Sequence, residues 1–568
     1  MPTDAFELLK TWCDSLLTCQ ISGTGQPALD GALLCPACQT IHGRCGELVY
    51  PLLALARRTG ESRYRTAALR LFAWSESLLA ADGAMVNDGQ SGWKGITVFA
   101  ALALCDALRR HGDLLEAADQ ARWRDRLRRH GDWISRHIDT RFAGNINYRA
   151  AGAGVLALLA NFFDVPDYMA KARRLAADVQ SHTGADGLLF GEGDPVDGLS
   201  PRGCRPVDIG YNVEESLPLM LLYAEESGDR EAEAWVTAAL HRHLDFQLPD
   251  GGWDDSFGTR NYKWTYWGSR TSEGCLEAYA LLGRRDPACA AAAARNLELM
   301  RRCTHDGLLT GGPDYPRVGA PACIHHSFTH ARGLAALLDR GLELPDAPAT
   351  RVPAGPALQH YPTIDTWRVQ YGGWVADVTG YDVTYRPGGH ATGGTLTLLW
   401  HRTAGPMALS AMTDYALVEA HNMQQMPALA CQGSLTPRLL AADGAASCYD
   451  RCAVLHAEEN GDGVAVEAEG RLCYPDGRAV PDGHYRLSCH FTDGLLRLTA
   501  EGGAYSPLWL VLPLARAAVY PVPAGEKPVF SLAGGLLAQE YRWPLRSGET
   551  LTVEVRPAPL AGVCPAEV

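Results

Sequence analysis

The sequence predicts a multidomain α+β protein: an N-terminal (α/α) toroid of about six helix pairs, followed by a C-terminal antiparallel β-sandwich-type domain. Apolar residues recur at helical spacing from residue 5 to about residue 340, whereas the rest of the chain alternates apolar and polar residues in short runs. A segment at 342–362 separates the two patterns and is too rich in proline for a helix. We therefore predict domains at residues 1–345 and 346–568.

The helical half contains about twelve segments with helical periodicity, joined by alternately short and long connectors. The long connectors, rich in Gly and Asp, include residues 82–93, 184–198 and 248–258. Helices joined as hairpins can close into a toroid whose long loops gather at one rim, where functional residues are commonly placed. The alternative is a helical solenoid that binds proteins, but no strict repeat period supports it.

The C-terminal half shows the two-residue period of strands. Leu396, Leu398 and Trp400 alternate with their neighbours, and Asp493-Gly494 is a strong signal for a two-residue hairpin turn. These features predict antiparallel sheets.

Composition limits the possible partners. The chain has 568 residues, more than one hydrophobic core usually holds, and its 47% hydrophobic and 20% charged residues are typical of folded globular domains. The net charge of -14 argues against nucleic acid or an anionic membrane as a general partner. An anionic substrate would therefore need a locally basic cleft.

The N-terminus and the cysteines bear on the compartment. Met1 begins an amphipathic helical pattern without the basic start and apolar run of a secretory signal, and no later stretch is apolar enough to span a membrane. The 17 cysteines are an odd number, many of them in apolar helices, which favours reduced thiols over a disulfide framework. We predict a cytoplasmic protein, or a periplasmic or secreted one if a signal peptide was removed. The sequence does not predict an oligomeric state.

Two segments of the helical half place polar side chains at the start of buried helices. Asn145 and Asn147 precede an apolar helix. An amide there can bind a carboxylate by hydrogen bonds without taking part in proton transfer itself. Asn145 can equally be a helix N-cap. Tyr211 precedes the next such helix and can act as acid or base, or it can pack beneath the loop with its hydroxyl bonded to backbone.

The connector at 251–274 is the densest polar and aromatic segment. Aromatic rings stack on sugar rings, and Arg pairs with carboxylate or sulfate, so this connector predicts the basic glycan-binding surface. Its predicted substrate-binding residues are Arg260, Tyr262, Trp264, Tyr266 and Arg270, with a further subsite at Asn87, Gln90 and Trp93.

Two groups of histidines suggest metal or proton-transfer chemistry. His326 and His330 share one helix face and could form a metal pair or a proton-transfer pair. In the β-domain, His390, Asp414 and His421 can meet across a sheet as a divalent metal site.

Near the N-terminus, a Cys-x2-Cys pair is followed by a His and a Cys, the number of ligands that a tetrahedral zinc site needs. The residues are Cys35, Cys38, His42 and Cys45. We favour reduced packing thiols over zinc for this segment, with His42 and Arg44 turned toward a cleft.

Four segments together resemble the heparinase II/III-like polysaccharide lyases, most closely polysaccharide lyase family 35, the glycosaminoglycan lyases. These are GNINY at 144–148, DIGYNVEES at 208–216, the connector at 251–274 and the histidine-containing region at 386–422. They follow the family's domain order over nearly the whole chain. The resemblance implies a lyase that acts on acidic, uronate-containing glycans.

The resemblance also implies roles for individual residues. Asn147 would neutralise the uronate carboxylate, Tyr211 would serve as acid or base, and His326 or His390 would complete the catalytic site. The family's metal in the β-domain would be held by His390, Asp414 and His421. The family's Glu-x-Ser-Pro-x-Tyr pattern stands here at 214–218 without its Tyr, so Tyr262 and Tyr266 are substitutes for the catalytic Tyr.

The predicted function is cleavage of uronate-containing acidic glycans by β-elimination, which yields unsaturated oligosaccharides. Removing the C5 proton of a uronate develops negative charge on its carboxylate, so neutralising that charge lowers the barrier. No organic cofactor is expected, and a divalent Zn or Mn ion in the β-domain would be structural. One alternative is a glycoside hydrolase using a carboxylate pair from Glu214, Glu215, Asp254 and Asp255. The other is a non-catalytic glycan-binding protein.

Overall fold

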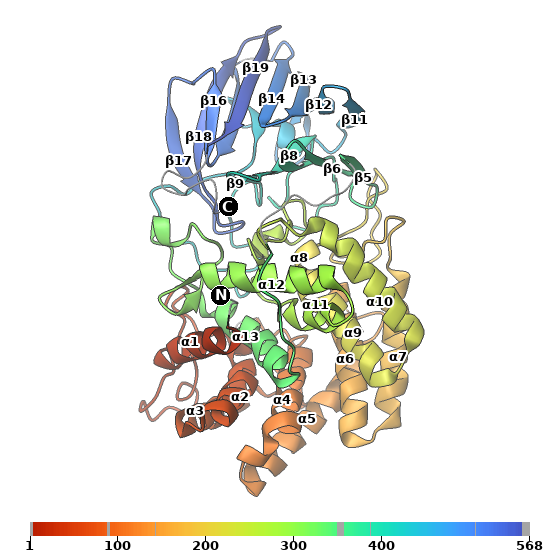
Figure 1. Cartoon of the computed structure of the whole chain (residues 1–568), viewed down its shortest axis with the longest axis vertical. Helices are drawn as coiled ribbons and strands as arrows, with labels where there is room; N and C mark the ends of the chain where they lie inside the picture. The colour runs from red at the N-terminus through yellow and green to blue at the C-terminus, as the bar shows by residue number, and fades with distance from the viewer. Residues whose placement is uncertain are drawn as a thin grey trace.

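The protein has a helical half and a strand-rich half, stacked end to end (Figure 1). The computed structural model describes residues 4–87, 91–142, 144–348, 357–386, 388–505 and 507–558. Gln90, a predicted substrate-binding residue, lies outside the described residues. The last long helix ends at Asp339 and the first strand of the second half begins at Leu358, on either side of the predicted boundary.

Most of the helical half consists of α-helices. They are α1 (Ala5–Thr18), α2 (Val49–Thr59), α3 (Ser62–Ser75), α4 (Thr97–His111), α5 (Ala117–His137), α6 (Ile146–Phe163), α7 (Pro166–Ser181), α8 (Ile209–Tyr211), α9 (Leu217–Ser227), α10 (Arg230–His243), α11 (Leu276–Gly283), α12 (Pro287–Arg302) and α13 (Ile324–Asp339). The π-helical segment η4 (Asn212–Ser216) joins α8 to α9. The 3-10 helices are η1 (Gly43–Leu48), η2 (Glu76–Leu78), η3 (Gly112–Leu114), η5 (Leu244–Phe246), η6 (Asn261–Lys263), η7 (Pro316–Val318) and η8 (Ser447–Tyr449).

The long helices form a closed double ring. In the inner ring α2, α4, α6, α9, α11 and α13 contact one another in turn, and α13 contacts α2. Each inner helix packs against an outer one: α3, α5, α7, α10, α12 and, for α13, the N-terminal helix α1. The predicted toroid of helix pairs is therefore confirmed, and the pairing of the first helix with the last one closes it.

Capping residues mark the ends of several helices. Asp4, Asp229 and Asp286 accept backbone N–H bonds at the starts of α1, α10 and α12, which satisfies donors that a helix leaves unpaired. Gly60 and Gly228 end α2 and α9 in the left-handed conformation. Among the described residues, no helix is long and apolar enough to cross a membrane.

The second half contains most of the strands. Four short strands lie in the toroid connectors: β1 (Trp264–Thr265), β2 (Gly268–Ser269), β3 (Thr304–His305) and β4 (Leu308–Leu309). The others are β5 (Leu358–Tyr361), β6 (Thr366–Tyr371), β7 (Trp374–Thr379), β8 (Thr395–His401), β9 (Gly405–Leu409), β10 (Arg438–Ala441), β11 (Val454–Asn460), β12 (Gly463–Cys473), β13 (Ala479–Thr492), β14 (Leu495–Gly502), β15 (Leu508–Leu514), β16 (Ala517–Tyr520), β17 (Glu526–Phe530), β18 (Leu537–Leu545) and β19 (Thr550–Pro557).

Three antiparallel sheets build the β-domain. Their strand orders are β5-β6-β7-β8-β9, β11-β12-β13-β14-β19-β16 and β10-β15-β18-β17. The predicted turn at Asp493-Gly494 joins β13 to β14, with Thr492 paired to Leu495. The antiparallel β-domain predicted from the alternating pattern is confirmed.

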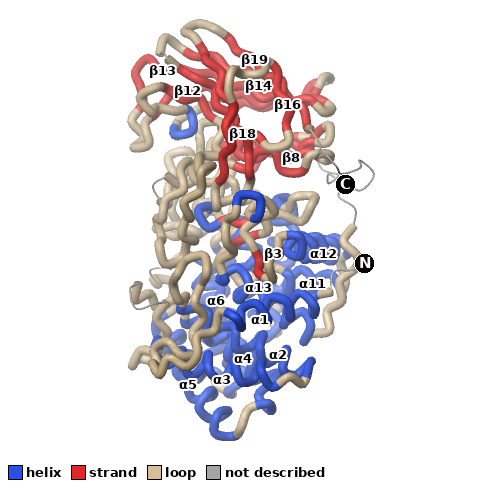
Figure 2. The backbone as a smooth tube through the Cα atoms, turned by 90° about the vertical axis from the view of Figure 1, so that its left-hand side faces the viewer, coloured by secondary structure: helices blue, strands red, loops and turns tan. Residues whose placement is uncertain are grey.

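The sheet β5–β9 lies between the toroid and the other sheets, as Figures 1 and 2 show from two sides. Every residue of β8 is buried, because one face packs on the toroid and the other on the sandwich. Leu398 and Trp400 belong to the toroid's core cluster, whereas Leu399 belongs to that of the sandwich. The two halves therefore share a continuous apolar contact.

A buried ion pair reinforces this contact. The Arg368 guanidinium on β6 donates to Asp254 of the toroid at 3.1 Å and to Asp377 on β7 at 2.8 and 3.0 Å. All three side chains are at most 2% exposed. One cation thus compensates two carboxylates from different domains.

Arg368→Ala should destabilise the fold strongly, because it leaves two carboxylates in the interior without a cation. The expected loss is roughly 3–5 kcal/mol in the free energy of unfolding, measured by urea denaturation. Arg402→Ala is the matched control, since Arg402 and its partner Asp493 are 58% and 80% exposed, and such a pair contributes little. Equal stability of the two variants would contradict this account of the interface.

Candidate active site

A cleft lies where the toroid rim meets the β-domain. Its volume is about 570 Å³, within the range of pockets that bind small ligands. Its walls come from the α6 entrance, the connectors around residues 93 and 194, Arg260, and two β-domain loops. The described polar and aromatic lining residues include Trp93, Arg141, Asn145, Tyr148, Arg149, Asp194, Asp197, Arg260, Tyr385, Arg386, Glu419, His421 and Asn422.

The cleft is basic although the chain is acidic. Among the described lining residues, four are arginines, from 141, 149, 260 and 386, against the acids at 194, 197 and 419. Arginine binds carboxylate and sulfate through paired N–H donors. The lining therefore carries a small excess of basic residues. Long loops lie between the helical half and the strand-rich half (Figure 2).

Asn145 and Glu192 shape the entrance of α6. Asn145 precedes the helix but makes no side-chain capping bond. The Asn147 backbone N–H instead donates to Glu192 Oε1 at 3.2 Å, and a carboxylate is favourable at a helix N-terminus. The Asn145 amide lies within hydrogen-bonding reach of the Tyr385 hydroxyl. Of the two predicted possibilities for Asn145, its geometry fits a cleft-facing amide rather than a cap.

Arg260 is the central cation of the site. Its Nη1 donates to Glu192 Oε2 at 3.1 Å, and its guanidinium carbon lies 3.7 Å from the centroid of the Tyr211 ring. Its backbone N–H donates to Asp208 at 2.8 Å, which ties the connector to the start of α8. Within the described chain, Arg260 Nε has no hydrogen-bond partner. Arg260 is thus held by Glu192 and Tyr211, lines the cleft, and keeps one unpaired N–H donor.

Asn147 and Tyr211 lie in a buried layer beneath Arg260. The Asn147 Nδ2 donates to Glu215, and the Tyr211 hydroxyl shares a hydrogen bond with Thr271. Burial raises the pKa of Tyr211 well above its ordinary value, against the opposing effect of Arg260. Burial, with Glu273 nearby, also raises the pKa of Glu215. Neither Asn147 nor Tyr211 is among the described residues that line the cleft.

Tyr385 presents a phenol in the cleft itself. It is half-buried, and the Arg386 guanidinium carbon lies 4.4 Å from its ring centroid. Burial raises the pKa of Tyr385; Arg260 and Arg386 oppose the rise, and Glu419 adds to it. The hydroxyl is therefore protonated at neutral pH and can donate.

Glu419 connects the β-domain to the connector. It accepts from the Tyr262 hydroxyl at 2.6 Å and pairs with the buried Lys263. Burial favours a higher pKa for Glu419, but Lys263 and Arg260 outweigh it and hold the pKa well below the ordinary range. Tyr262 thus supports the cleft through Glu419.

The segment 419–424 brings His421 and Asn422 to the cleft. The Asn422 carbonyl accepts from Arg270, and its side chain accepts from Asn87 Nδ2 at 3.5 Å. Arg270 and Asn87 are both buried and act here behind the wall. Trp93 does line the cleft, where its indole N–H donates to the Tyr148 hydroxyl at 2.9 Å.

Three predicted site residues are packed in the interior. Trp264 is 1% exposed with its indole N–H bonded to the Trp253 carbonyl, and the Tyr266 hydroxyl donates to Asp250. His326 is buried, with Nδ1 3.2 Å from the Leu309 carbonyl oxygen. The expectation of ring-stacking surfaces at Trp264 and Tyr266 must be corrected, because the β-domain covers the connector.

The predicted metal site in the β-domain must also be corrected. Both ring nitrogens of His390 contact backbone carbonyls, of Val383 at 2.5 Å and Ala391 at 3.0 Å. Among the described residues, His390, Asp414 and His421 are not brought together as metal ligands. His390 instead lines a hollow that shares Tyr385 and Arg386 with the cleft. The groups that do converge are Cys35, Cys38, His42 and Cys323, and His241, Asp286 and Cys289.

The four acids predicted for a hydrolase, Glu214, Glu215, Asp254 and Asp255, are buried and bonded to other residues of the protein. A glycoside hydrolase instead needs two carboxyl groups that flank the glycosidic bond. None of the four acids is among the described residues that line the cleft. Their partners are His330 for Glu214, Asn147 for Glu215, Arg368 for Asp254 and the Ile209 N–H for Asp255.

Sequence reasoning missed Arg149, Tyr385, Arg386 and Glu419. Tyr385 and Arg386 stand just before a Gly-Gly pair in a β-domain loop. The criterion applied to the connector at 251–274, aromatic and basic residues in a glycine-rich segment, would have found them there.

Comparisons with known proteins agree with this architecture. A family model described as the ulvan lyase N-terminal domain matches residues 9–354, and one described as the ulvan lyase C-terminal domain matches residues 358–522. A broad-specificity ulvan lyase from Formosa agariphila is 36% identical over 569 residues, covering 96% of this chain and 88% of that protein.

The chain also aligns with two solved structures. A heparan sulfate lyase from Pedobacter heparinus aligns with 99% of this chain and 84% of its own, at 11% identity and a TM-score of 0.46. A heparinase III aligns with 90% of this chain and 77% of its own, at 12% identity and a TM-score of 0.48.

The matched domains and the basic cleft define the protein as a polysaccharide lyase, as the sequence motifs predicted. The chain belongs to the ulvan lyase family.

Glu419→Gln should loosen the β-domain wall of the cleft, because it leaves Lys263 buried without an anion. We expect a loss of roughly 2–5 kcal/mol in the free energy of unfolding and faster proteolysis within 411–424. Thermal melting and limited proteolysis measure both. Glu459→Gln, on the exposed strand β11, is the control. If Glu419→Gln melts like that control, Glu419 is not the anchor of this wall.

Proposed function

We propose that this enzyme cleaves an acidic, uronate-containing polysaccharide by β-elimination in the cleft between toroid and β-domain, with ulvan as the substrate class. The observation that carries the proposal is the convergence of Arg260, Asn145, Tyr385 and His421 in one basic cleft. The ulvan activity named for the Formosa relative supports the substrate class.

Arg260 and Asn145 are suited to hold the uronate carboxylate. Arg260 is fixed by Glu192 and Tyr211 and keeps N–H donors beyond its ion pair. Charge develops on the carboxylate when the C5 proton leaves, and preorganised donors stabilise it without reorganising. Asn147 and Tyr211 then act as positioning residues: Tyr211 supports the guanidinium directly, and Asn147 binds Glu192 and Glu215 behind it.

Each of the two proton transfers has its own residue: His421 is the base and Tyr385 is the acid. A neutral imidazole can accept a proton, so His421 serves as the base that takes the C5 proton. The electron pair forms the C4–C5 double bond, and the C4–O bond to the leaving sugar breaks. The protonated Tyr385 hydroxyl gives its proton to the departing oxygen.

The decisive test is the product. Incubation with ulvan should generate a new double bond, seen as rising ultraviolet absorbance, together with shorter oligosaccharides. Cleavage that yields only saturated products would establish a hydrolase, and no cleavage of any acidic glycan would leave a binding protein.

Tyr385→Phe should lower kcat by about 10²–10⁴-fold, because the leaving oxygen loses its acid. Tyr211→Phe is the matched comparison, since its hydroxyl bonds to Thr271 beneath the cleft, and we expect less than about a tenfold loss there. Steady-state kinetics on ulvan measure both variants, with circular dichroism as the folding control. A large loss confined to Tyr211→Phe would transfer the acid role to Tyr211.

The pH profile tests His421. A base must be deprotonated to act, so kcat/KM of the wild type should fall as the pH decreases. His421→Asn should lose this acidic limb and about 10²–10⁴-fold of its rate. His305→Asn, at an exposed position far along the chain, should keep the wild-type profile. An unchanged limb in His421→Asn would assign the base elsewhere.

A further inference from the structure

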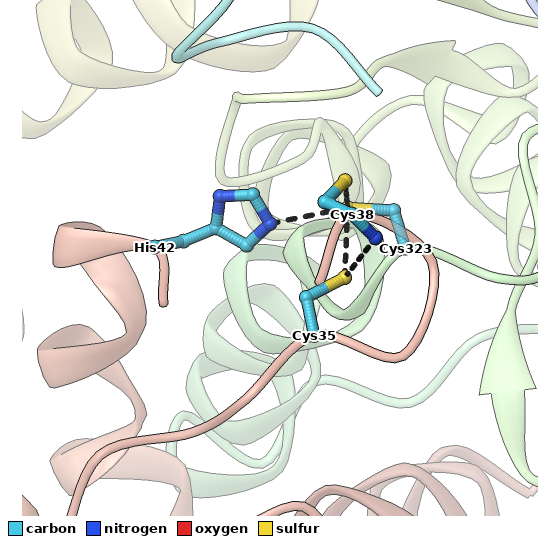
Figure 3. Close-up of side chains that lie close together, drawn as sticks. All are labelled: Cys35, Cys38, His42 and Cys323. Atoms are coloured by element: carbon cyan, nitrogen blue, oxygen red, sulfur yellow. Dashed lines mark hydrogen bonds between the residues drawn. The ribbon is translucent and has the colours of Figure 1, made fainter. Parts of the chain in front are cut away.

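Three thiols and one imidazole lie close together in the helical half (Figure 3). Cys35, Cys38 and His42 come from the loop that follows α1, and Cys323 immediately precedes α13. Cys323 Sγ lies 3.7 Å from Cys35 Sγ, 3.6 Å from Cys38 Sγ and 3.6 Å from His42 Nε2. All four side chains are buried, and the thiols are free rather than disulfide-bonded.

These separations match the edges of a zinc tetrahedron. With Zn–S bonds of about 2.3 Å and a Zn–N bond of about 2.0 Å, tetrahedral geometry places sulfurs about 3.8 Å apart and a sulfur about 3.5 Å from the nitrogen. The potential ligand atoms of the cluster all lie within 4.8 Å of one another. Thiolates with an imidazole are a ligand set that favours zinc over manganese.

The surroundings supply what a thiolate-rich zinc site needs. The Cys38 backbone N–H donates to Cys35 Sγ at 3.3 Å, and Arg270 Nη2 lies 2.9 Å from Cys323 Sγ and 3.8 Å from Cys38 Sγ. Three thiolates and one Zn²⁺ carry a net charge of -1, which the Arg270 guanidinium neutralises. Such outer contacts orient the ligands and stabilise their charge.

Cys45, the fourth ligand suggested by local spacing, is not part of the cluster. Burial raises the pKa of its thiol to about 12, so it remains protonated. Cys323 takes its place from a position 288 residues after Cys35 in the chain.

We propose that Cys35, Cys38, His42 and Cys323 bind one structural Zn²⁺, with Arg270 as the compensating cation. The three thiols release their protons to solvent when the ion binds. The ion fastens the loop after α1 to the entrance of α13, where the ring of helices closes. Because Arg270 also donates to the Asn422 carbonyl, the site supports the cleft wall without touching substrate.

Metal analysis of the full-length protein, purified without chelators, tests the site. We expect about one zinc per chain, retained after dialysis and released when the thiols are modified. Preparations of folded, active protein without zinc, or a disulfide mapped between Cys38 and Cys323, would overturn the proposal.

Cysteine variants identify the ligands. Cys323→Ala should lose most of the zinc and lower the melting temperature, whereas Cys45→Ala should keep about one zinc per chain. Zinc lost from Cys45→Ala but kept by Cys323→Ala would overturn the assignment in favour of the local set.

If Cys323→Ala does not fold, cobalt substitution of the wild-type protein gives the answer. Co²⁺ in a tetrahedral site with three thiolates should show sulfur-to-metal charge-transfer bands and visible ligand-field bands. A spectrum of an octahedral oxygen-bound ion would contradict the proposal.

Discussion

The site depends on one constraint: each buried cation near the cleft must be paired with an acid. Arg260, Lys263 and Arg368 lie in the interior, where an unpaired charge is costly, and each contacts an acid from another part of the chain. Glu192 holds Arg260, Glu419 holds Lys263, and two aspartates hold Arg368. These ion pairs fix the positions of the connector, the α6 entrance and the β-domain relative to one another. They therefore determine the shape of the cleft.

The β-domain is therefore part of the site rather than an appendage. Its inner sheet contributes apolar residues to the toroid's core, and its loops bring Tyr385, Glu419 and His421 to the cleft. A toroid alone would offer Arg260 and Asn145 but no facing wall. In the proposed mechanism, the toroid wall binds the carboxylate and the β-domain wall supplies the acid and the base.

The sequence allowed the architecture to be predicted because periodicity and turns are local. Helical spacing indicated the toroid, and Asp493-Gly494 marked a hairpin that joins β13 to β14. Contacts between distant segments were not predictable in this way. Cys323 could not be matched with Cys35 by spacing, and the burial of Trp264 depends on a domain that covers its connector. Asn145 and Arg260 were predicted as substrate-binding residues because a helix entrance and a basic aromatic connector are recognisable locally.

The π-helical turn at η4 sets the directions of two adjacent buried acids. A π-turn accommodates one residue more than an α-turn, and such bulges are often found at functional sites. Glu214 accepts from the Ser269 backbone N–H at 2.7 Å, whereas Glu215 accepts from the Asn147 amide on α6. Deleting one residue from this turn would rotate the side chains on one side of it by about 100° about the helix axis, out of line with these partners.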